Sequence, residues 1–324
     1  MTNKKKLFKQ ITIIGLGLIG SSLALSIKKN KISSKTVGYS RSSKTRNTSK
    51  RLNLVDKVSN KLEESVRGSD LIIICTPLSS YSNIIKKIIP HISKGTIISD
   101  VGSAKEKTIN EIIPLLSNDD IFIPAHPIAG TEKSGPSAGF AELFDDRWCI
   151  ITPLKNNKKS HINKVKNLWK SLGSDVEVMS PQRHDRVMAI TSHLPHLIAY
   201  NIVSTAADLE NVTKSDIIKY SASGFRDFTR IASSDPTMWR DIFLNNKEAV
   251  LEMISRFTED FAVFLGISEK NLQMRNAKLT RKYVRFKLCK PQDRGAIGGR
   301  QRSSLPSPPL DLANFLHLES GGVR

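Results

Sequence analysis

The chain has 324 residues, 39% of them hydrophobic and 25% charged, which is enough for two domains with apolar cores. No apolar run reaches the roughly 20 residues that a membrane span requires. Its three cysteines, Cys75, Cys149 and Cys289, lie too far apart for a disulfide framework or a cysteine-based zinc site. We therefore expect a reduced, cytoplasmic protein that does not span a membrane.

The net charge of +20 is concentrated at the two ends of the chain. Residues 1–55 hold 13 Lys plus Arg and no acidic residue, and residues 281–324 hold nine basic residues against three acidic ones. The 225 residues between them are nearly neutral, with 28 basic and 27 acidic residues. A nucleic-acid reader needs a basic face on its folded body, usually with a recognition motif. The sequence shows neither, so we expect no nucleic-acid partner.

Lysines near the start, followed by the uncharged stretch Ile11–Ile27, resemble the basic and apolar regions of a secretory signal peptide. Three glycines would interrupt the apolar helix of such a signal, and two further lysines follow without a convincing cleavage site. We therefore expect this stretch to belong to the folded domain.

Short β-rich runs alternate with longer amphipathic stretches from Ile11 to Met179, which is typical of a parallel sheet wrapped by helices. The high Ile and Val content of the runs predicts strands buried on both faces. The expected strands are Ile11–Ile14, Thr36–Tyr39, Leu71–Cys75, Thr96–Ser99, Ile121–Pro124, Trp148–Thr152 and Asp175–Met179, and the expected helices are Gly20–Lys29, Ser79–Ile89, Lys105–Leu116 and Ser160–Leu172.

Beyond Met179 the pattern becomes helical up to about residue 280. Asp235 is the expected N-cap of the last helix, and Gly266 is its expected terminator. Long apolar helices without a sheet need each other or a second subunit, so we predict a homodimer through this half. The expected helices are Pro181–Leu209 with a kink at Pro195, Ser215–Tyr220 and Pro236–Leu265, with a polar break over Ser223–Arg230.

A glycine motif follows the first predicted strand directly and opens a helix. In this context its glycines allow a tight turn, a close approach of the backbone to a pyrophosphate, and close packing of the helix on the strand. We expect Gly15, Leu16, Gly17, Leu18, Ile19 and Gly20 to bind a dinucleotide.

These patterns predict an α/β fold with a Rossmann-like, doubly wound dinucleotide-binding domain over residues 1–179. An all-α substrate and dimerisation domain is expected over residues 180–280. Glycine and proline interrupt every short apolar run of residues 281–324, so we predict a basic, flexible tail there.

The end of the second strand bears on the choice of dinucleotide. Enzymes that use NAD usually place an acidic residue there, whereas this sequence has Ser40 and Arg41, which suit a 2′-phosphate. We therefore favour NADP over NAD, with an exposed basic loop as the alternative explanation. Thr76 and Pro77 follow another strand and are expected to line the cofactor crevice.

Two residues after later strands are candidates for chemistry. His126 follows a strand in a polar, glycine-bearing loop, where its ordinary pKa of about 6.5 would suit a general base. A packed structural histidine explains the position equally well. Ser103 is placed either to donate to a substrate or to cap the helix beginning near Lys105, and from sequence the cap is favoured.

The helical half adds further polar candidates. His193 and His196 are three residues apart, but no carboxylate or cysteine set accompanies them, so we expect no metal. Arg230 can clamp a substrate carboxylate or pair with Asp227 one helical turn away.

Together these segments resemble the prephenate and arogenate dehydrogenase family of tyrosine biosynthesis. The resemblance covers about Gln10 to Phe286 and rests on five motifs in order, GLGLIG, DVGS, HPIAGTEKSG, SHLPH and GFRDFTRIASSDPTMWRDI. It implies a dinucleotide-binding domain and a helical dimerisation domain. It also implies hydride transfer from the hydroxyl-bearing ring carbon of the substrate to NAD(P)+, coupled to loss of the ring carboxylate as carbon dioxide.

The resemblance also implies roles for individual residues. His126 corresponds to the catalytic histidine that polarises the ring hydroxyl, Ser103 to its neighbour at that hydroxyl, and Arg230 to a binder of a substrate carboxylate. The resemblance further implies that the substrate pocket is lined or gated by five residues: His196, Thr131, Glu132, Asp227 and Trp239. The last of these can come from the partner subunit.

Two other functions remain open from the sequence. A dehydrogenase of 3-hydroxy acids has a similar architecture but relies on a lysine in its helical domain, where this chain offers His193, His196 and Arg230. A non-catalytic NADP-binding or nucleic-acid-associated protein would account only for Arg41 and the basic ends. The sequence also leaves both prephenate and arogenate open as the substrate, although Glu132 could pair with the amine of arogenate.

Overall fold

The structure, a computed structural model, describes residues 6–116, 121–213 and 218–266. The chain divides into two compact units. The first runs to His193 and also includes Asp241–Lys247, and the second contains Leu194–Arg240 and the chain from Glu248 onward. The tail predicted at 281–324 lies outside the described residues. Within the described part, no helix is long and apolar enough to cross a membrane.

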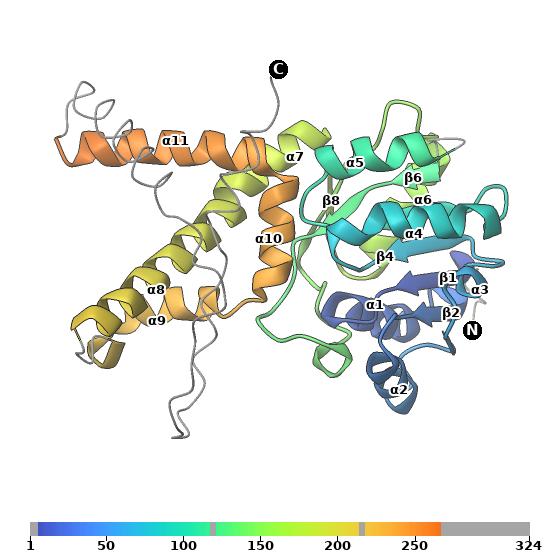
Figure 1. Ribbon diagram of the computed structural model, residues 1–324. Coiled ribbons are helices and arrows are strands. Elements are labelled where there is room, and N and C mark those ends of the chain that lie inside the picture. Colours follow the sequence, from blue (N-terminus) through green and yellow to red (C-terminus); the bar gives the residue numbers. More distant parts are fainter. Residues whose placement is uncertain (1–5, 117–120, 214–217, 267–324) are drawn as a thin grey trace, which may run out of the picture. The chain divides into compact units, whose positions relative to one another are not determined.

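The first unit is built on a six-stranded sheet in the order β3-β2-β1-β4-β5-β6 (Figure 1). All neighbouring strands are parallel, and Ile11 of the central β1 pairs with Thr36 of β2 and Leu71 of β4. This order is that of dinucleotide-binding folds, in which ligands bind beyond the carboxyl ends of the strands where the order reverses. The predicted fold class is confirmed. The strands are β1 Phe8–Ile14, β2 Ser33–Tyr39, β3 Lys57–Ser59, β4 Leu71–Ile74, β5 Ile97–Asp100 and β6 Phe122–Ile123.

Alternate strand residues face opposite sides of this sheet, and helices cover both sides. Ile11 and Ile13 join one apolar core with Leu23 of α1 (Leu18–Lys29) and Trp169 of α6 (Lys159–Ser171). Helices α4 (Tyr81–Ile88) and α5 (Glu106–Ile112) lie beside each other, as Figure 1 shows, and bury further isoleucines. Short 3-10 turns follow or precede several of these elements: η1 Leu78–Ser80, η2 Ile89–His91, η3 Ile113–Leu115 and η5 Pro136–Ala138.

Helix α2 (Ser43–Arg51) was not predicted, and neither was the short α3 (Leu62–Ser65). The sequence of α2, SKTRNTSKR, contains no apolar residue, so it has no hydrophobic periodicity to indicate a helix. Its start is set by Ser42, whose side chain accepts a hydrogen bond from the amide of Thr45 at 3.3 Å.

A second, three-stranded sheet has the order β7-β8-β9. Strands β7 (Ala125–Pro127) and β8 (Trp148–Ile151) are antiparallel, while β8 and β9 (Asp175–Val178) are parallel. The expectation that all strands are buried on both faces was wrong for β9, which is largely exposed. The expected loop position of His126 was wrong as well, because this residue is the middle one of β7 and pairs with Ile150.

The predicted helix Pro181–Leu209 consists of α7 (Pro181–Met188), a π turn η6 (Ala189–His193) and α8 (Leu194–Thr213). Pro195 lacks the backbone N–H that would continue an α-helical ladder, and the wider turn lies immediately before it. The irregularity expected at this proline is therefore present as a π turn. The last residue of this turn, His193, ends the first of the two segments that make up the first unit.

The remaining helices are η7 (Ile218–Tyr220), α9 (Ser223–Ala232), α10 (Pro236–Asn245) and α11 (Lys247–Phe264). The polar break expected over Ser223–Arg230 was wrong, because this segment forms α9. Asp235 is the N-cap of α10 as predicted, since its carboxylate accepts from the amides of Thr237 and Met238 at 2.8 and 3.0 Å. Gly266 ends α11 with a φ of 65°.

The predicted single helix Pro236–Leu265 is divided at Asn246, which is 3% exposed. Its side-chain amide donates to the carbonyl of Asp185 at 2.8 Å, which keeps this polar group satisfied inside the first unit. In the second unit α8 contacts α9, and the Tyr200 hydroxyl donates to the carbonyl of Ser234 at 2.9 Å. Exposed apolar side chains gather toward the end of α11, at Phe257, Phe261, Val263, Phe264 and Leu265.

Candidate active site

The glycine motif forms the tight connection from β1 to α1. Gly15 has a φ of 100°, and a Cβ there would lie 2.5 Å from the carbonyl oxygen of Cys75. A Cβ on Gly20 would overlap the carbonyl oxygen of Gly15, so only glycine permits the helix to begin so close to the strand. At Gly17 a Cβ would meet nothing within 4 Å. The space at Gly17 is thus left open by the protein itself.

The start of α1 fits an anionic ligand. Its N-cap, Gly17, provides no side-chain hydrogen bond, and the first turn contains no acidic residue. The first backbone N–H groups of a helix attract negative charge such as a pyrophosphate. Leu16 is buried in the core beneath the turn, whereas Leu18 and Ile19 are partly buried. The residues present therefore fit a dinucleotide at this turn.

Exchanging each of two glycines for alanine should separate folding from cofactor binding. Gly20→Ala should lower Tm by several degrees, because its Cβ overlaps the Gly15 carbonyl and the helix must shift. Gly17→Ala should leave Tm within about a degree of the wild type but weaken NAD(P)H binding, because its Cβ enters the open space. Thermal melts and fluorescence titration with NAD(P)H measure both effects. Unchanged cofactor affinity in Gly17→Ala would contradict the placement of the pyrophosphate.

The loop after β2 contains Ser40 and Arg41, which are expected to contact the ribose of the cofactor. Arg41 is exposed and Ser40 partly buried. The guanidinium of Arg46 donates to the carbonyls of both residues at 2.8 Å, which holds the backbone of this loop in place. The first acidic residue of the chain, Asp56, accepts instead from the amide and hydroxyl of Thr36 at 2.6 and 2.8 Å. Residues 40–55, which follow β2 in the chain, therefore supply no carboxylate at its end.

After β4, Thr76 and Pro77 begin a second loop at the same edge of the sheet. Part of the Thr76 side chain would lie 2.9 Å from a Cβ on Gly15, so the residue adjoins the glycine turn. Its hydroxyl shares a hydrogen bond with that of Ser80 at 2.7 Å. Pro77 is the exposed N-cap of η1.

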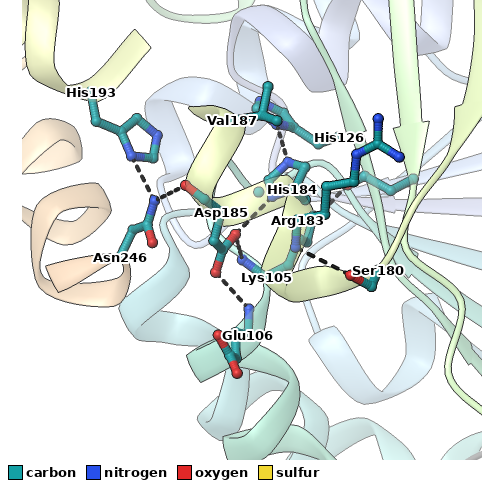
Figure 2. Close-up of polar contacts among 12 residues, drawn as sticks. Lys105, Glu106, His126, Ser180, Arg183, His184, Asp185, Val187, His193 and Asn246 are labelled. Carbon is teal, nitrogen blue, oxygen red and sulfur yellow. Dashed lines mark hydrogen bonds and ion pairs between the residues drawn. The ribbon is translucent and has the colours of Figure 1, made fainter. Parts of the chain in front are cut away.

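His126 is 8% exposed and is the first member of a chain of three side chains (Figure 2). Its Nδ1 lies 2.8 Å from Nε2 of His184, and Nδ1 of His184 lies 2.7 Å from Oδ1 of Asp185. Both partners come from α7 and are buried, with exposed fractions of 0% and 3%. Within the described residues, Nε2 of His126 has no hydrogen-bond partner. One nitrogen of this histidine is thus held, and the other remains available.

The carboxylate of Asp185 also caps helix α5. Its Oδ1 accepts from the amide of Lys105, and its Oδ2 accepts from the amide of Glu106, both at 2.9 Å. Ser103 was expected to provide this cap, and that expectation was wrong. The described part of the chain gives the Ser103 hydroxyl no hydrogen bond, so it remains available to a ligand.

A buried ion pair fixes the backbone just before His126. The ammonium of Lys105 lies 2.7 Å from Oδ2 of Asp100, and the two side chains are 1% and 0% exposed. The same ammonium donates to the carbonyl of Ala125 at 2.6 Å, while Oδ1 of Asp100 accepts from the amide of Ala125 at 3.1 Å. Both polar groups of Ala125 are therefore bound to one ion pair.

The electrostatics of this cluster favour neutral imidazoles. Burial lowers the pKa of His126 well below its ordinary range, and repulsion from the charged forms of His184, Lys105 and His193 opposes its protonation further. Burial also lowers the pKa of His184, although its hydrogen bond to Asp185 opposes this shift. At neutral pH, His126 is therefore an uncharged proton acceptor.

The second unit brings four of the remaining candidates together in pairs. The rings of His196 and Trp239 stack with centroids 3.7 Å apart and an interplanar angle of 21°. The Nε of Arg230 lies 3.8 Å from Oδ1 of Asp227, and their side chains are 63% and 74% exposed. A pair so exposed contributes little to stability, so the guanidinium remains accessible to a ligand. Thr131 and Glu132, in the first unit, lie exposed in the loop after β7.

Sequence reasoning missed four residues of this site: His184, Asp185, Lys105 and Asp100. Ser180 and Pro181 gave a signal that could have located the first two, because they mark a helix start shortly before an adjacent His-Asp pair. Asp100 opens the DVGS motif, but the sequence gives no sign that it pairs with Lys105, since a buried lysine is recognised only in three dimensions. The described residues include no cluster of metal-binding side chains.

The sheet order, the glycine turn and the buried histidine define an NAD(P)-dependent oxidoreductase. The family model "Prephenate dehydrogenase, nucleotide-binding domain" matches residues 23–178, and "Prephenate dehydrogenase, dimerization domain" matches residues 180–269. The chain belongs to the prephenate dehydrogenase family.

Individual relatives agree with this assignment. A cyclohexadienyl dehydrogenase of Zymomonas mobilis is 40% identical over 253 residues, covering 78% of this chain and 86% of that protein. A prephenate dehydrogenase of Bacillus subtilis is 36% identical, covering 77% of this chain and 66% of the relative. The structure of Aquifex aeolicus prephenate dehydrogenase with hydroxyphenyl propionate and NAD+ superposes with a TM-score of 0.74 at 32% identity, covering 85% and 98% of the two chains. These relatives do not favour the 3-hydroxy acid or non-catalytic alternatives.

Proposed function

We propose that the protein oxidises and decarboxylates prephenate, arogenate or both, with NAD(P)+ as hydride acceptor, in tyrosine biosynthesis. The observation that carries this proposal is the geometry of His126, whose Nδ1 is bound to His184 and whose Nε2 is available. A neutral imidazole with one open nitrogen is suited to accept the proton of a substrate hydroxyl. Family membership supplies the substrate class.

In the proposed reaction, Nε2 of His126 accepts the proton of the ring hydroxyl while a hydride leaves the same carbon. The nicotinamide supplies the hydride acceptor when it is bound. The bond from the ring to its carboxylate then breaks, its electron pair completes the aromatic ring, and carbon dioxide leaves. The proton on His126 returns to the phenolate oxygen, so the base is regenerated. Ser103 is proposed to donate a hydrogen bond to the same oxygen.

The second unit is proposed to bind the rest of the substrate and to form a homodimer. Arg230 offers a planar guanidinium, which suits a substrate carboxylate, while His196, Trp239 and Asp227 line or gate the pocket. Thr131 and Glu132 are assigned to the substrate from the first unit. The exposed aromatic side chains of α11 support a dimer through the helical unit, since such apolar surface usually marks an interface.

The function is tested by steady-state kinetics with prephenate and arogenate, each with NAD+ and NADP+. Release of carbon dioxide and of an aromatic product in step with NAD(P)H supports the proposal. Oxidation of a 3-hydroxy acid without decarboxylation would overturn it. A marked preference for arogenate that Glu132→Gln abolishes would assign Glu132 to the substrate amine.

Cofactor preference should depend on Arg41. We propose that Ser40 and Arg41 hold the 2′-phosphate of NADP, because the end of β2 offers a guanidinium and a hydroxyl instead of a carboxylate. NADP+ should therefore give the higher kcat/KM, and Arg41→Asp should reverse or erase that preference. Arg51→Asp, which introduces the same change at the far end of α2, is the matched control. A wild-type enzyme that prefers NAD+ would contradict the assignment.

A further inference from the structure

We propose that His184 and Asp185 are positioning residues that hold the neutral ring of His126 in the tautomer with its proton on Nδ1. This inference rests on the proposed function only in giving His126 the role of base. It concerns two residues of α7 that act on the substrate oxygen only through His126.

The direction of the hydrogen bonds follows from the carboxylate at the end of the chain. An ionised carboxylate only accepts hydrogen bonds, so Asp185 requires a proton on Nδ1 of His184. Because His184 is neutral, its Nε2 then carries a lone pair. That lone pair, 2.8 Å from Nδ1 of His126, requires a proton on the latter atom. The lone pair of His126 is consequently placed on Nε2, where the proton of the substrate hydroxyl must arrive.

The orientation of Asp185 is itself fixed by the backbone. Its two oxygens accept from the first amides of α5, at Lys105 and Glu106, so the carboxylate cannot rotate without uncapping that helix. The Asn246 amide donates to the carbonyl of the same aspartate, and the adjoining Nδ1 of His193 lies 3.0 Å from that amide (Figure 2).

The charged and titratable groups that act on His126 belong to this cluster. They are His184 on α7, Lys105 before α5 and His193 in the π turn, whose protonated forms lower the pKa of His126. Asp100 pairs with the ammonium of Lys105, and Asp185 accepts a hydrogen bond from the neutral ring of His184. Of these groups only His184 forms a hydrogen bond with Nδ1 of His126, so His184 determines where the proton resides.

Substituting asparagine for Asp185 should remove the bias in the chain of protons. Oδ1 of Asp185 accepts from both the Lys105 amide and Nδ1 of His184, and Oδ2 accepts from the Glu106 amide, so an asparagine keeps an oxygen at only one of these positions. In the molecules whose NH2 group faces His184, that ring carries its proton on Nε2 and donates to Nδ1 of His126, which moves the proton of His126 onto Nε2. In contrast, His184→Gln can still accept from Nδ1 of His126 through its amide oxygen and should preserve the tautomer.

The experiment compares the wild type with the variants Asp185→Asn, His184→Gln and His184→Leu. Tautomers are read from ¹⁵N chemical shifts of histidine-labelled protein at alkaline pH, with His126→Asn used to assign the signal of His126. The wild type and His184→Gln should show the proton on Nδ1, and Asp185→Asn should show a measurable fraction of it on Nε2. His184→Leu should lose the single preferred tautomer.

Kinetics supplies the second measurement. His184→Leu should lower kcat by roughly 10²- to 10⁴-fold with KM and cofactor affinity little changed, as expected for a base without a fixed tautomer. Asp185→Asn should lower kcat in proportion to the fraction of His126 that carries its proton on Nε2. His184→Gln should retain kcat within about tenfold of the wild type, because the tautomer is kept. Asp56→Asn is the matched control, because Asp56 also accepts hydrogen bonds from Thr36 within the same unit but makes none to the histidines.

A single, unchanged His126 tautomer in a folded His184→Leu protein would overturn the inference. So would a loss of kcat in His184→Gln as large as that in His184→Leu, since it would assign His184 a purely steric role. Circular dichroism and Tm identify variants that fail to fold, and His184→Gln then still decides the question. A wild type inactive with prephenate and arogenate would refute the proposed function, whereas the tautomer measurement would stand on its own.

Discussion

His126→Asn should lower kcat by roughly 10²- to 10⁴-fold, because asparagine can donate a hydrogen bond but cannot accept the hydroxyl proton as a base. Substrate binding should survive, since Arg230 and the other residues assigned to the substrate remain. Stopped-flow and steady-state measurements of NAD(P)H formation at saturating substrate give the effect directly.

The pH profile sharpens this test. Burial and nearby positive charge lower the pKa of His126, so its competent neutral form persists to a lower pH than that of an exposed histidine. The acid limb of kcat/KM for the wild type should therefore fall below about pH 6.5, the ordinary pKa of histidine, and it should flatten in His126→Asn. If the variant kept most of its kcat with an unchanged profile, His126 would be a structural residue and another group would be the base.

Arg230→Ala should raise KM for prephenate or arogenate by roughly 10²-fold, because one carboxylate of a dianionic substrate loses its charged partner. Arg230→Lys should recover only part of this loss, since an ammonium cannot form two parallel hydrogen bonds. Cofactor affinity should stay near normal in both variants.

Arg226→Ala is the matched control for Arg230, because Arg226 is an arginine one turn earlier on α9. It should leave KM within about twofold of the wild type, as expected for an arginine that is not assigned to the substrate carboxylate. Equal weakening of cofactor and substrate binding by Arg230→Ala would instead indicate a structural role. Thermal melts should show little change for Arg230→Ala, as the ion pair of Arg230 with Asp227 is mostly exposed.

Local sequence patterns accounted for most of the first sheet. The buried strands are continuous runs of isoleucine and leucine, as at Leu71–Ile74, and the glycine spacing at Gly15 follows from close backbone approaches that no other residue allows. Helix α2 was missed because polar residues leave no periodicity to detect. The division at Asn246 was missed because a single buried amide, bound to Asp185 and His193, interrupts an otherwise continuous helical pattern.

The candidate site was only partly predictable for a different reason. His126 was found because it follows a strand-like run, but its partner His184 is 58 residues away in sequence. Which histidines meet depends on how β7 and α7 pack, and no short pattern contains that information. The buried pair of Lys105 and Asp100 belongs to the same category, since a lysine is expected to be exposed until its partners are known.

The carboxylate of Asp185 has two structural roles. It accepts the hydrogen bond from His184, and it caps the first turn of α5. Fraying of that turn would release the carboxylate from the amides of Lys105 and Glu106, and with it the anchor of His184. Hydrogen exchange at these two amides therefore measures how often the native protein loses the hydrogen bonds that hold His126 in its reactive tautomer. Substitutions in α5 far from any ligand that speed this exchange should lower the active fraction of enzyme in the same proportion.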